Sequence, residues 1–311
     1  MLPLSDPGDK PYLISMSSTL GGAPETFRIY AWNATHGGGK RRAPDEYRVQ
    51  FTGKRPEIVP GQRTIVLGWS EKFQVFAGWD ARTHRDRESA SPSLQIRQAT
   101  LEAAQVEGLA AAVRTSGDIV VAISPDFLPV YFWNADALHQ DGSPELVEAL
   151  NKIPKESPTV TVPLEEAIED TTPRQQLVRT IRTNYRAWDF GLRVRRAYGD
   201  MCAICGLQLG LVEAAHIVPV AWPGSTDATS NGIALCRNHH RAYDSAILNF
   251  SDDMRVLVAP NLEERFGSDS KLGGFEELRR LAGERVANLP SKESEHPLPE
   301  NVANGRAARG W

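Results

Sequence analysis

The stretch Met201–Ile247 begins MCAICG and ends SNGIALCRNHHRAYDSAI, and it holds all three cysteines of the 311-residue chain. Cys202 and Cys205 form a C-x-x-C pair, and Cys236 precedes His239 at the same spacing. Two such pairs can clamp one tetrahedral metal ion from two tight turns. We therefore expect a structural zinc site, because four protein ligands leave no open coordination position. A redox pair or buried thiols are the alternative, but no β-α-β context surrounds the cysteines.

Other polar residues of this stretch follow a second pattern. His216 ends the apolar segment VEAAH, Asn231 begins NGIALC, and His240 lies in HHRAYD. His240 adjoins His239 and is therefore an alternative fourth ligand of the zinc. Asp244 follows His240 by four positions, so the two side chains share one face if the segment is a helix.

The order His216, Asn231, His240 between cysteine pairs resembles the HNH, or ββα-metal, nucleases. The similarity covers about Tyr185 to Phe250 and extends to bacterial restriction endonucleases, including modification-dependent enzymes of the McrA type. These enzymes carry motifs similar to AHIVP, NGIALC and HHRAYD of this chain. The resemblance implies a ββα-metal fold and a hydrolase that cuts DNA.

The resemblance also implies a role for each matching residue. His216 would be the general base that deprotonates the attacking water, a role that suits histidine at neutral pH. Asn231 would fix the loop and orient the base, and His240 would bind one catalytic Mg²⁺ or Mn²⁺. That ion would bridge the scissile phosphate and the leaving 3′ oxygen.

Two positions depart from the family pattern. Many relatives carry Asp or His immediately before the base as a second metal ligand, where this chain has Ala215. Asp244 is the candidate for the missing catalytic-metal ligand, and Glu213 is the alternative. His239 stands where relatives often have a fourth cysteine, and Cys₃His is still a common structural zinc set. A zinc-stabilised fold without catalysis is the competing interpretation, and Ala215 is its best support.

Charge and composition narrow the class of protein. The net charge is −4, so any DNA-binding surface must come from local patches. No apolar run reaches the length of a membrane span, and the start MLPLSDPGDK lacks the apolar core of a signal peptide. An odd number of cysteines, all at metal-binding spacing, fits a reducing compartment. We therefore expect a cytoplasmic protein without membrane association.

The chain is long enough for two domains, and we expect an α+β protein. Residues 1–152 should form a β-rich DNA-reading domain, residues 153–173 a proline-containing acidic linker, and residues 174–311 the nuclease domain. Short β-branched and aromatic runs predict strands at Tyr12–Met16, Thr26–Asn33, Glu46–Thr52, Thr64–Trp69, Phe73–Trp79, Asp118–Ile123, Leu128–Trp133 and Arg255–Ala259. Helices are expected at Ala99–Val113, Pro144–Leu150 and near Phe275–Leu281.

A PUA/SRA-like β-barrel fits the strand content of residues 1–152, by analogy with partner domains of similar enzymes. In several such enzymes the reading domain flips a modified cytosine into an aromatic pocket. Tryptophans in strands more often belong to the core, but the candidate pocket residues are Trp32, Trp69, Trp79 and Trp133. For phosphate contact the candidates are Lys40, Arg41 and Arg42, with a solvated loop as the alternative.

A second basic segment, residues 174–196, carries many arginines and a single acidic residue, Asp189. Its apolar residues recur at helical spacing, so most of the arginines should lie outside the buried face. A solvated helix face would normally offer acidic partners, and their scarcity favours contact with the DNA backbone. The expected DNA-binding residues are Arg182, Arg186, Arg193, Arg196, Arg237 and Arg241.

These observations predict a restriction-type, metal-dependent endonuclease for double-stranded DNA with a specific sequence or a modified cytosine. The expected cofactors are structural Zn²⁺ and catalytic Mg²⁺ or Mn²⁺. Two alternatives stay open, a nonspecific HNH nuclease and a zinc-stabilised DNA-binding protein without nuclease activity. Because one ββα site cuts one strand, a homodimer would serve a double-strand break.

Overall fold

The computed structural model describes residues 2–4, 10–16, 23–37, 43–51, 56–82, 93–140, 142–155, 172–266 and 273–311. Internal contacts divide the chain into two units. Unit 1 combines Met1–Glu156 with Glu169–Tyr185, and unit 2 combines Ser157–Ile168 with Arg186–Trp311. One division therefore falls inside a helix, between Tyr185 and Arg186.

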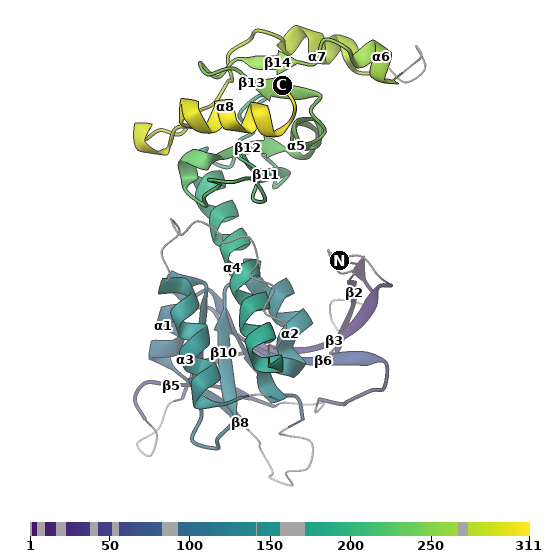
Figure 1. Ribbon diagram of the computed structural model, residues 1–311. Coiled ribbons are helices and arrows are strands. Elements are labelled where there is room, and N and C mark those ends of the chain that lie inside the picture. The colour runs from purple at the N-terminus through teal and green to yellow at the C-terminus, as the bar shows by residue number, and fades with distance from the viewer. Residues whose placement is uncertain are drawn as a thin grey trace. The chain divides into compact units, whose positions relative to one another are not determined.

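Unit 1 is built on a seven-stranded mixed sheet in the order β1-β2-β3-β6-β7-β10-β9. Strands β2, β3, β6 and β10 of this sheet are labelled in Figure 1. Strands β3 and β6 are parallel, and the other neighbours are antiparallel. A smaller antiparallel sheet has the order β4-β5-β8. The strands are β1 (Leu2–Pro3), β2 (Tyr12–Met16), β3 (Glu25–Asn33), β4 (Thr35–His36), β5 (Glu46–Gln50), β6 (Gln62–Ser70), β7 (Val75–Trp79), β8 (Ser93–Arg97), β9 (Leu109–Val113) and β10 (Ile119–Ile123).

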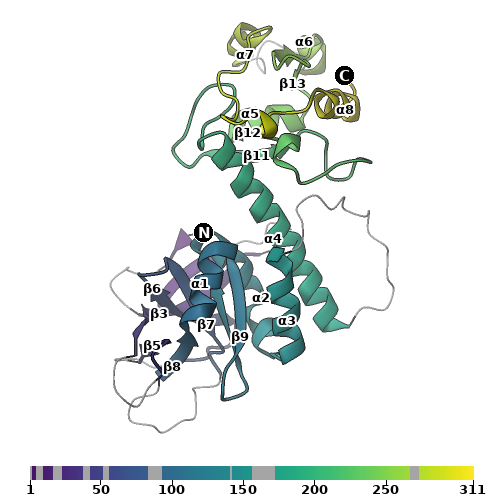
Figure 2. The same cartoon turned by 90° about the vertical axis from the view of Figure 1, so that its left-hand side faces the viewer.

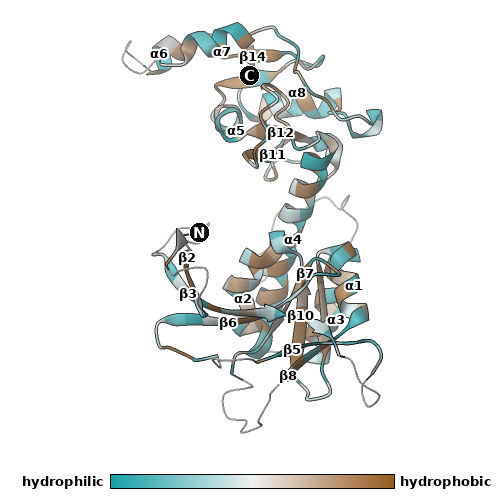
Figure 3. Cartoon of the chain, turned by 180° about the vertical axis from the view of Figure 1, so that it is seen from behind, coloured by the Kyte–Doolittle hydropathy of each residue, from teal (hydrophilic) through white to brown (hydrophobic). Residues whose placement is uncertain are grey.

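The seven-stranded sheet is covered on both faces, because successive side chains point to opposite sides of a strand. On one face Tyr30 and Trp79 pack with Val49 and Leu94 of the smaller sheet in one apolar core. The indole Nε1 of Trp79 donates to the carbonyl of Gln95 at 3.2 Å and so joins the two sheets. Strand β10 is buried at every position and hydrophobic throughout (Figure 3), as a strand covered on both sides should be.

The opposite face is covered by α2 (Leu128–Gln140), α3 (Pro144–Lys152) and the start of α4 (Pro173–Ala197), as Figure 2 shows. Phe27 of β3 stacks on Phe132 of α2 with ring centroids 5.7 Å apart. A Cβ atom on Gly78 of β7 would collide with the hydroxyl group of Tyr131, so glycine permits this close approach of α2. The N-terminus of α3 is capped by Ser143, whose hydroxyl accepts from the Leu146 amide.

Two predicted elements of unit 1 are wrong. The predicted strand at Leu128–Trp133 is the first part of α2, because Tyr131, Phe132 and Leu138 bury one helical face against the sheet. The predicted helix at Ala99–Val113 ends early, as α1 (Gln98–Glu107). Gly108 follows it with φ 80°, a left-handed conformation that terminates helices, and β9 then pairs with β10. The other predicted strands and both other helices are confirmed, with ends at most two residues from those predicted.

The PUA/SRA-like barrel is not confirmed, because β1 and β9 are the two ends of the seven-stranded order and do not pair within the described ranges. Trp32 and Trp79 are buried core residues, whereas Trp69 and Trp133 are half-buried. Lys40, Arg41 and Arg42 lie outside the described residues. The mixed α+β class is confirmed.

Helix α4 contributes to both units. In unit 1 its residues Leu177, Ile181 and Tyr185 are buried, and the Tyr185 hydroxyl donates to the carbonyl of Glu107 at 2.7 Å. Its remaining residues belong to unit 2. Across the described ranges, no helix combines the length and the apolar character that a membrane crossing demands.

Unit 2 is centred on an antiparallel pair, β11 (Val212–His216) and β12 (Gly232–Cys236), followed by α5 (Arg237–Asp244). His216 lies opposite Gly232, where an added Cβ would collide with Val194 of α4, so this helix packs tightly on the strand pair. The remaining elements are η3 (Thr229–Asn231), β13 (Leu248–Phe250), β14 (Val256–Val258), α6 (Leu262–Phe266), α7 (Phe275–Leu281), η5 (Glu293–Glu295) and α8 (Pro299–Ala308).

Candidate active site and metal centre

The four expected zinc ligands converge in unit 2. The ligand atoms of Cys202, Cys205, Cys236 and His239 all lie within 4.8 Å of one another. Nδ1 of His239 is 3.4 Å from Cys202 Sγ and 3.3 Å from Cys236 Sγ, and Cys205 Sγ is 4.0 Å from Cys236 Sγ. The edges of a tetrahedral zinc site are about 3.5 to 3.8 Å for ordinary Zn–N and Zn–S bonds. The cluster therefore fits zinc, and His239 completes it rather than His240.

The electrostatics of the thiols also point to a cation. The pKa of Cys202 is lowered to about 6, because hydrogen bonds from His239 and from backbone amides outweigh the effect of burial. Burial, together with the adjacent sulfurs, raises the pKa of Cys205 to about 12. One thiolate is thus favoured and further thiolates are disfavoured. A bound dication removes this conflict by neutralising the sulfurs together.

His216 is held at the end of β11 by two contacts. Its ring stacks on Phe190 of α4, with centroids 3.7 Å apart and planes 10° from parallel. Its Nε2 lies 3.2 Å from Oδ1 of Asp227. The side chain is 19% exposed, so the ring reaches the surface while its orientation is fixed.

Asp227 belongs to no sequence motif and was not among the predicted site residues. Its Oδ2 accepts from Arg186 Nε at 2.9 Å and Nη2 at 2.6 Å, and its side chain is 10% exposed. Burial alone would raise the pKa of Asp227, but the His216 hydrogen bond and the Arg186 charge outweigh it and lower the pKa. Asp227 is the single acidic residue between His216 and Asn231, and this position is the feature of the sequence that could have identified it as a site residue.

Asn231 is fully buried and organises the loop after β11. Its Oδ1 accepts from the Val218 amide at 2.9 Å, and its Nδ2 donates to the Thr226 carbonyl at 2.8 Å. Its own carbonyl accepts from the Ile217 amide at 2.8 Å. A short side chain thus fixes both ends of a loop that begins beside His216.

His240 lies on α5 between two carboxylates. Its Nδ1 is 3.0 Å from Glu213 Oε2, and its Nε2 is 3.4 Å from Asp244 Oδ2. Asp244 is half exposed, whereas the His240 side chain is 21% exposed. Both candidates for the additional metal ligand, Asp244 and Glu213, therefore adjoin His240.

Arg309, at the end of α8, connects these groups. Its Nη2 donates to the His216 carbonyl at 3.0 Å, and its Nη1 donates to the Ile217 carbonyl at 2.7 Å. Its guanidinium lies 3.8 Å from the ring centroid of Tyr243, and Nη2 is 4.0 Å from Asp244 Oδ1. One side chain, 8% exposed, therefore touches the backbone of the candidate base and a carboxylate beside His240.

Two protein families match separate parts of the chain. Residues 25–132 match a family described as methylase-associated X1. Residues 202–250 match one described as HNH endonuclease, and they contain the zinc cluster, His216, Asn231 and His240. Residues 202–250 are an HNH endonuclease domain. The chain therefore contains an HNH endonuclease domain, which makes it a DNA endonuclease.

Two further comparisons concern the whole chain. The chain is similar to the solved structure of a modification-dependent TagI restriction endonuclease, with a TM-score of 0.30 and 13% sequence identity. This alignment covers 93% of the present chain and 82% of the other. No curated protein matches the chain.

The remaining candidate DNA contacts differ in their surroundings. Within the HNH domain, Arg237 is 71% exposed and its Nε is 2.9 Å from Glu213 Oε1, and Arg241 is exposed. Arg196 of α4 is also exposed, whereas Arg182 is half-buried in unit 1. Contact of these arginines with DNA stays a prediction.

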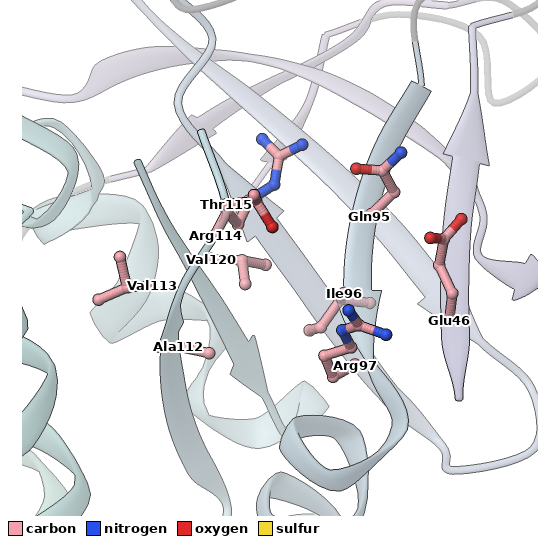
Figure 4. A pocket seen from close by; sticks show the side chains of 9 residues that line it. All are labelled: Glu46, Gln95, Ile96, Arg97, Ala112, Val113, Arg114, Thr115 and Val120. Atoms are coloured by element: carbon pink, nitrogen blue, oxygen red, sulfur yellow. The ribbon is translucent and has the colours of Figure 1, made fainter. Parts of the chain in front are cut away.

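A cavity of about 90 Å³ lies in unit 1, away from the HNH domain in sequence (Figure 4). Two of its arginines are already paired, Arg97 with Asp45 at 2.7 Å and Arg114 with Asp118 at 2.6 Å. The cavity is lined by Glu46, Gln95, Ile96, Arg97, Ala112, Val113, Arg114, Thr115 and Val120. None of the four tryptophans considered for a base pocket lines it.

Proposed function

We propose that the protein is a metal-dependent, restriction-type endonuclease that hydrolyses double-stranded DNA, with His216 as the general base. The observation that carries the proposal is the common neighbourhood of His216 and Asp244. Within the HNH unit, the Arg309 guanidinium bonds to the carbonyl of the first and lies 4.0 Å from the carboxylate of the second. The backbone of His216 and the Asp244 carboxylate thus lie beside one guanidinium group.

His240 and Asp244 fit a hard divalent cation such as Mg²⁺ or Mn²⁺. Their facing atoms are 3.4 Å apart, and two ligands of one octahedral ion with bonds of about 2.1 Å lie about 3 Å apart. The opposite ring nitrogen of His240 adjoins Glu213, an arrangement in which a carboxylate orients a metal-binding imidazole. When bound, the cation would supply stabilisation of the charge that develops on the leaving oxygen.

In the proposed reaction, His216 takes a proton from water as the water oxygen attacks phosphorus. The bond to the 3′ oxygen breaks, which leaves a 5′-phosphate and a 3′-hydroxyl. Asn231 keeps the loop beside the base in place through its three backbone partners. The exposed arginines of unit 2 supply phosphate contacts, which position a duplex without reading its sequence.

We assign target reading to unit 1, because its residues 25–132 match a second family that is separate from the HNH match. The description of that family as methylase-associated supports a reader that responds to DNA methylation, and we propose cytosine as the modified base. A double-strand break needs two cuts, so we expect the active enzyme to be a homodimer in the cytoplasm. Digestion of one plasmid prepared with and without cytosine methylation tests the reader. Equal cleavage of both preparations would refute the dependence on modification.

The catalytic proposal is tested with His216→Ala. Loss of a general base should lower the cleavage rate by about 10²- to 10⁴-fold while zinc content and DNA affinity persist. His296→Ala is the matched control, because this histidine bonds to the Pro290 carbonyl and, among the described residues, makes no side-chain hydrogen bond to His216, Asn231 or His240. Wild-type cleavage by His216→Ala would refute the assigned mechanism.

The competing function is DNA binding without cleavage, which Ala215 favours. Incubation of the purified protein with plasmid and Mg²⁺, Mn²⁺ or Ni²⁺ distinguishes the nuclease from the DNA-binding protein. Nicking that EDTA abolishes supports the nuclease. Binding without cleavage under all three ions supports the alternative.

A further inference from the structure

We propose that Asp227 is a positioning residue for His216, which it holds through Nε2 so that Nδ1 is the atom that takes the proton from water. This inference rests on the proposed function, in which His216 is the general base. It assigns the basic atom and the group that orients it.

The direction of the hydrogen bond follows from the charge of Asp227. The Arg186 guanidinium lies 2.6 Å from Oδ2, so this carboxyl group is favoured in its ionised form. An ionised carboxylate only accepts, and the imidazole must therefore donate through Nε2 at 3.2 Å. A neutral imidazole has one N–H group, so Nδ1 carries the lone pair. Among the described residues, no group hydrogen-bonds to Nδ1.

The proton balance of the step is complete. Nδ1 receives one proton from the attacking water while the water oxygen bonds to phosphorus and the bond to the 3′ oxygen breaks. The departing 3′ oxygen takes a proton from solvent water, and the hydroxide so formed later takes the extra proton from the imidazolium. The imidazolium then carries protons on both nitrogens, and the Asp227 carboxylate lies beside the new positive charge. A carboxylate in this place both fixes the tautomer and stabilises the protonated ring.

Asp227 is itself held from two sides by α4. Arg186 binds its Oδ2 twice, and Arg193 Nη2 donates to its backbone carbonyl at 2.8 Å. Phe190 of the same helix stacks on the imidazole at 3.7 Å. Positions 186, 190 and 193 share one helical face. The hydrogen bond limits rotation of the His216 ring in its plane, and the stacking limits its tilt.

A metal-ligand role for Asp227 is the alternative. The two Arg186 hydrogen bonds occupy Oδ2, and His216 occupies Oδ1. His240 and Asp244 offer the better cation site. Nε2 of His240 and Oδ2 of Asp244 are 3.4 Å apart, and no arginine is hydrogen-bonded to His240 among the described residues. Positioning of His216 is therefore the role that the contacts of Asp227 support.

The kinetic test compares Asp227→Asn and Asp227→Glu in the full-length, zinc-loaded protein. Asparagine can donate to the imidazole and stabilise the wrong tautomer, so we expect kcat to fall by about 10²- to 10⁴-fold with KM and DNA affinity unchanged. Glutamate restores the carboxylate and should recover part of kcat. Asp252→Asn is the control, because it removes an arginine-paired carboxylate, 2.7 Å from Arg306, outside the site. Wild-type kcat in Asp227→Asn overturns the proposal.

The second measurement does not depend on cleavage. Nitrogen-15 spectra of the histidine rings report which ring nitrogen carries the proton, and the His216→Ala spectrum assigns the signal. We expect His216 to be the Nε2–H tautomer in the wild type, and a tautomer mixture in Asp227→Ala. An Nδ1–H tautomer in the wild type overturns the proposal even if Asp227 variants fail to fold. If His216→Ala cleaves normally, the proposed function fails while the spectra still decide the His216–Asp227 contact.

Discussion

Arg309 donates a hydrogen bond of 3.0 Å to the carbonyl of His216, a residue 93 positions earlier in the chain. The same guanidinium lies over Tyr243 of α5, with 3.8 Å to the ring centroid. The last turn of the C-terminal helix thus joins the strand that carries the candidate base to the helix that carries His240. This contact makes α8 part of the framework of the candidate active site.

Arg309→Lys should weaken both cleavage and stability. Lysine keeps the charge but cannot donate to two carbonyls in the planar geometry of a guanidinium. We expect a loss of about 2 kcal/mol in the free energy of unfolding, measured by urea denaturation, and a lower kcat. Arg279→Lys on the exposed surface of α7 is the control. An unchanged kcat would contradict the role of Arg309 in the candidate site, and an unchanged free energy of unfolding would contradict its role in holding α8.

Gly305→Ala should loosen α8 without removing any polar group. A Cβ at this position would collide with the Ile217 carbonyl, the neighbour of the candidate base. Because overpacking typically costs about 1 to 3 kcal/mol, we expect a lower melting temperature for unit 2. Gly273→Ala is the matched control, because no heavy atom within 4 Å meets its added Cβ. Equal melting temperatures for the two variants would show that the packing of α8 does not depend on the close contact between Gly305 and the Ile217 carbonyl.

Removal of zinc should unfold unit 2 selectively. The ligand atoms join the turn before β11 to the start of α5, and structural zinc sites of this kind contribute directly to folding. We expect 1,10-phenanthroline, or Cys236→Ser, to abolish the thermal transition of unit 2 and leave that of unit 1. Metal analysis should return one zinc per chain. Retention of both transitions after complete zinc removal would contradict a structural site.

Asp244→Asn should weaken the response to catalytic metal. The substitution removes the negative charge 3.4 Å from His240 Nε2, so more Mg²⁺ or Mn²⁺ should be needed for half-maximal cleavage, by about tenfold or more. Glu213→Gln should have a smaller effect, since Glu213 adjoins the other ring nitrogen. Glu276→Gln on α7 is the surface control. A larger effect of Glu213→Gln would show that Glu213 is the metal ligand and that Asp244 orients His240.

His139 makes unit 1 sensitive to acid. Burial is the main cause that lowers the pKa of His139 to about 4, from an ordinary value of 6.5, and its Nε2 is 2.9 Å from the Tyr131 hydroxyl. Between these pH values His139 is protonated in the unfolded chain and neutral in the folded chain. Its contribution to the free energy of unfolding is therefore complete above pH 6.5 and is lost as the pH falls toward 4. His139 is partly exposed, so we expect a loss of about 1 kcal/mol between about pH 7 and 5. Urea denaturation of unit 1 should show this slope in the wild type and not in His139→Gln.

Local sequence determined much of this protein. The spacing of Cys202, Cys205, Cys236 and His239 was sufficient to predict the zinc cluster, because each pair takes its geometry from one turn. Most strands of unit 1 were predicted from short β-branched and aromatic runs bounded by turn residues. The order of His216, Asn231 and His240, together with the flanking cysteine pairs and the local motifs, indicated the HNH domain that the family match confirms.

Tertiary contacts decided the rest. Residues Leu128–Trp133 have strand composition, yet they form a helix because one helical face buries Tyr131 and Phe132 against the sheet. Asp227 and Arg309 carry no motif, because their partners are His216 and Arg186 in one case and a distant carbonyl in the other. A short sequence pattern reflects only interactions between residues that are close in sequence. The orientation of the His216 ring depends on α4, the loop after β11 and α8 together, and only the folded chain brings these segments to one imidazole.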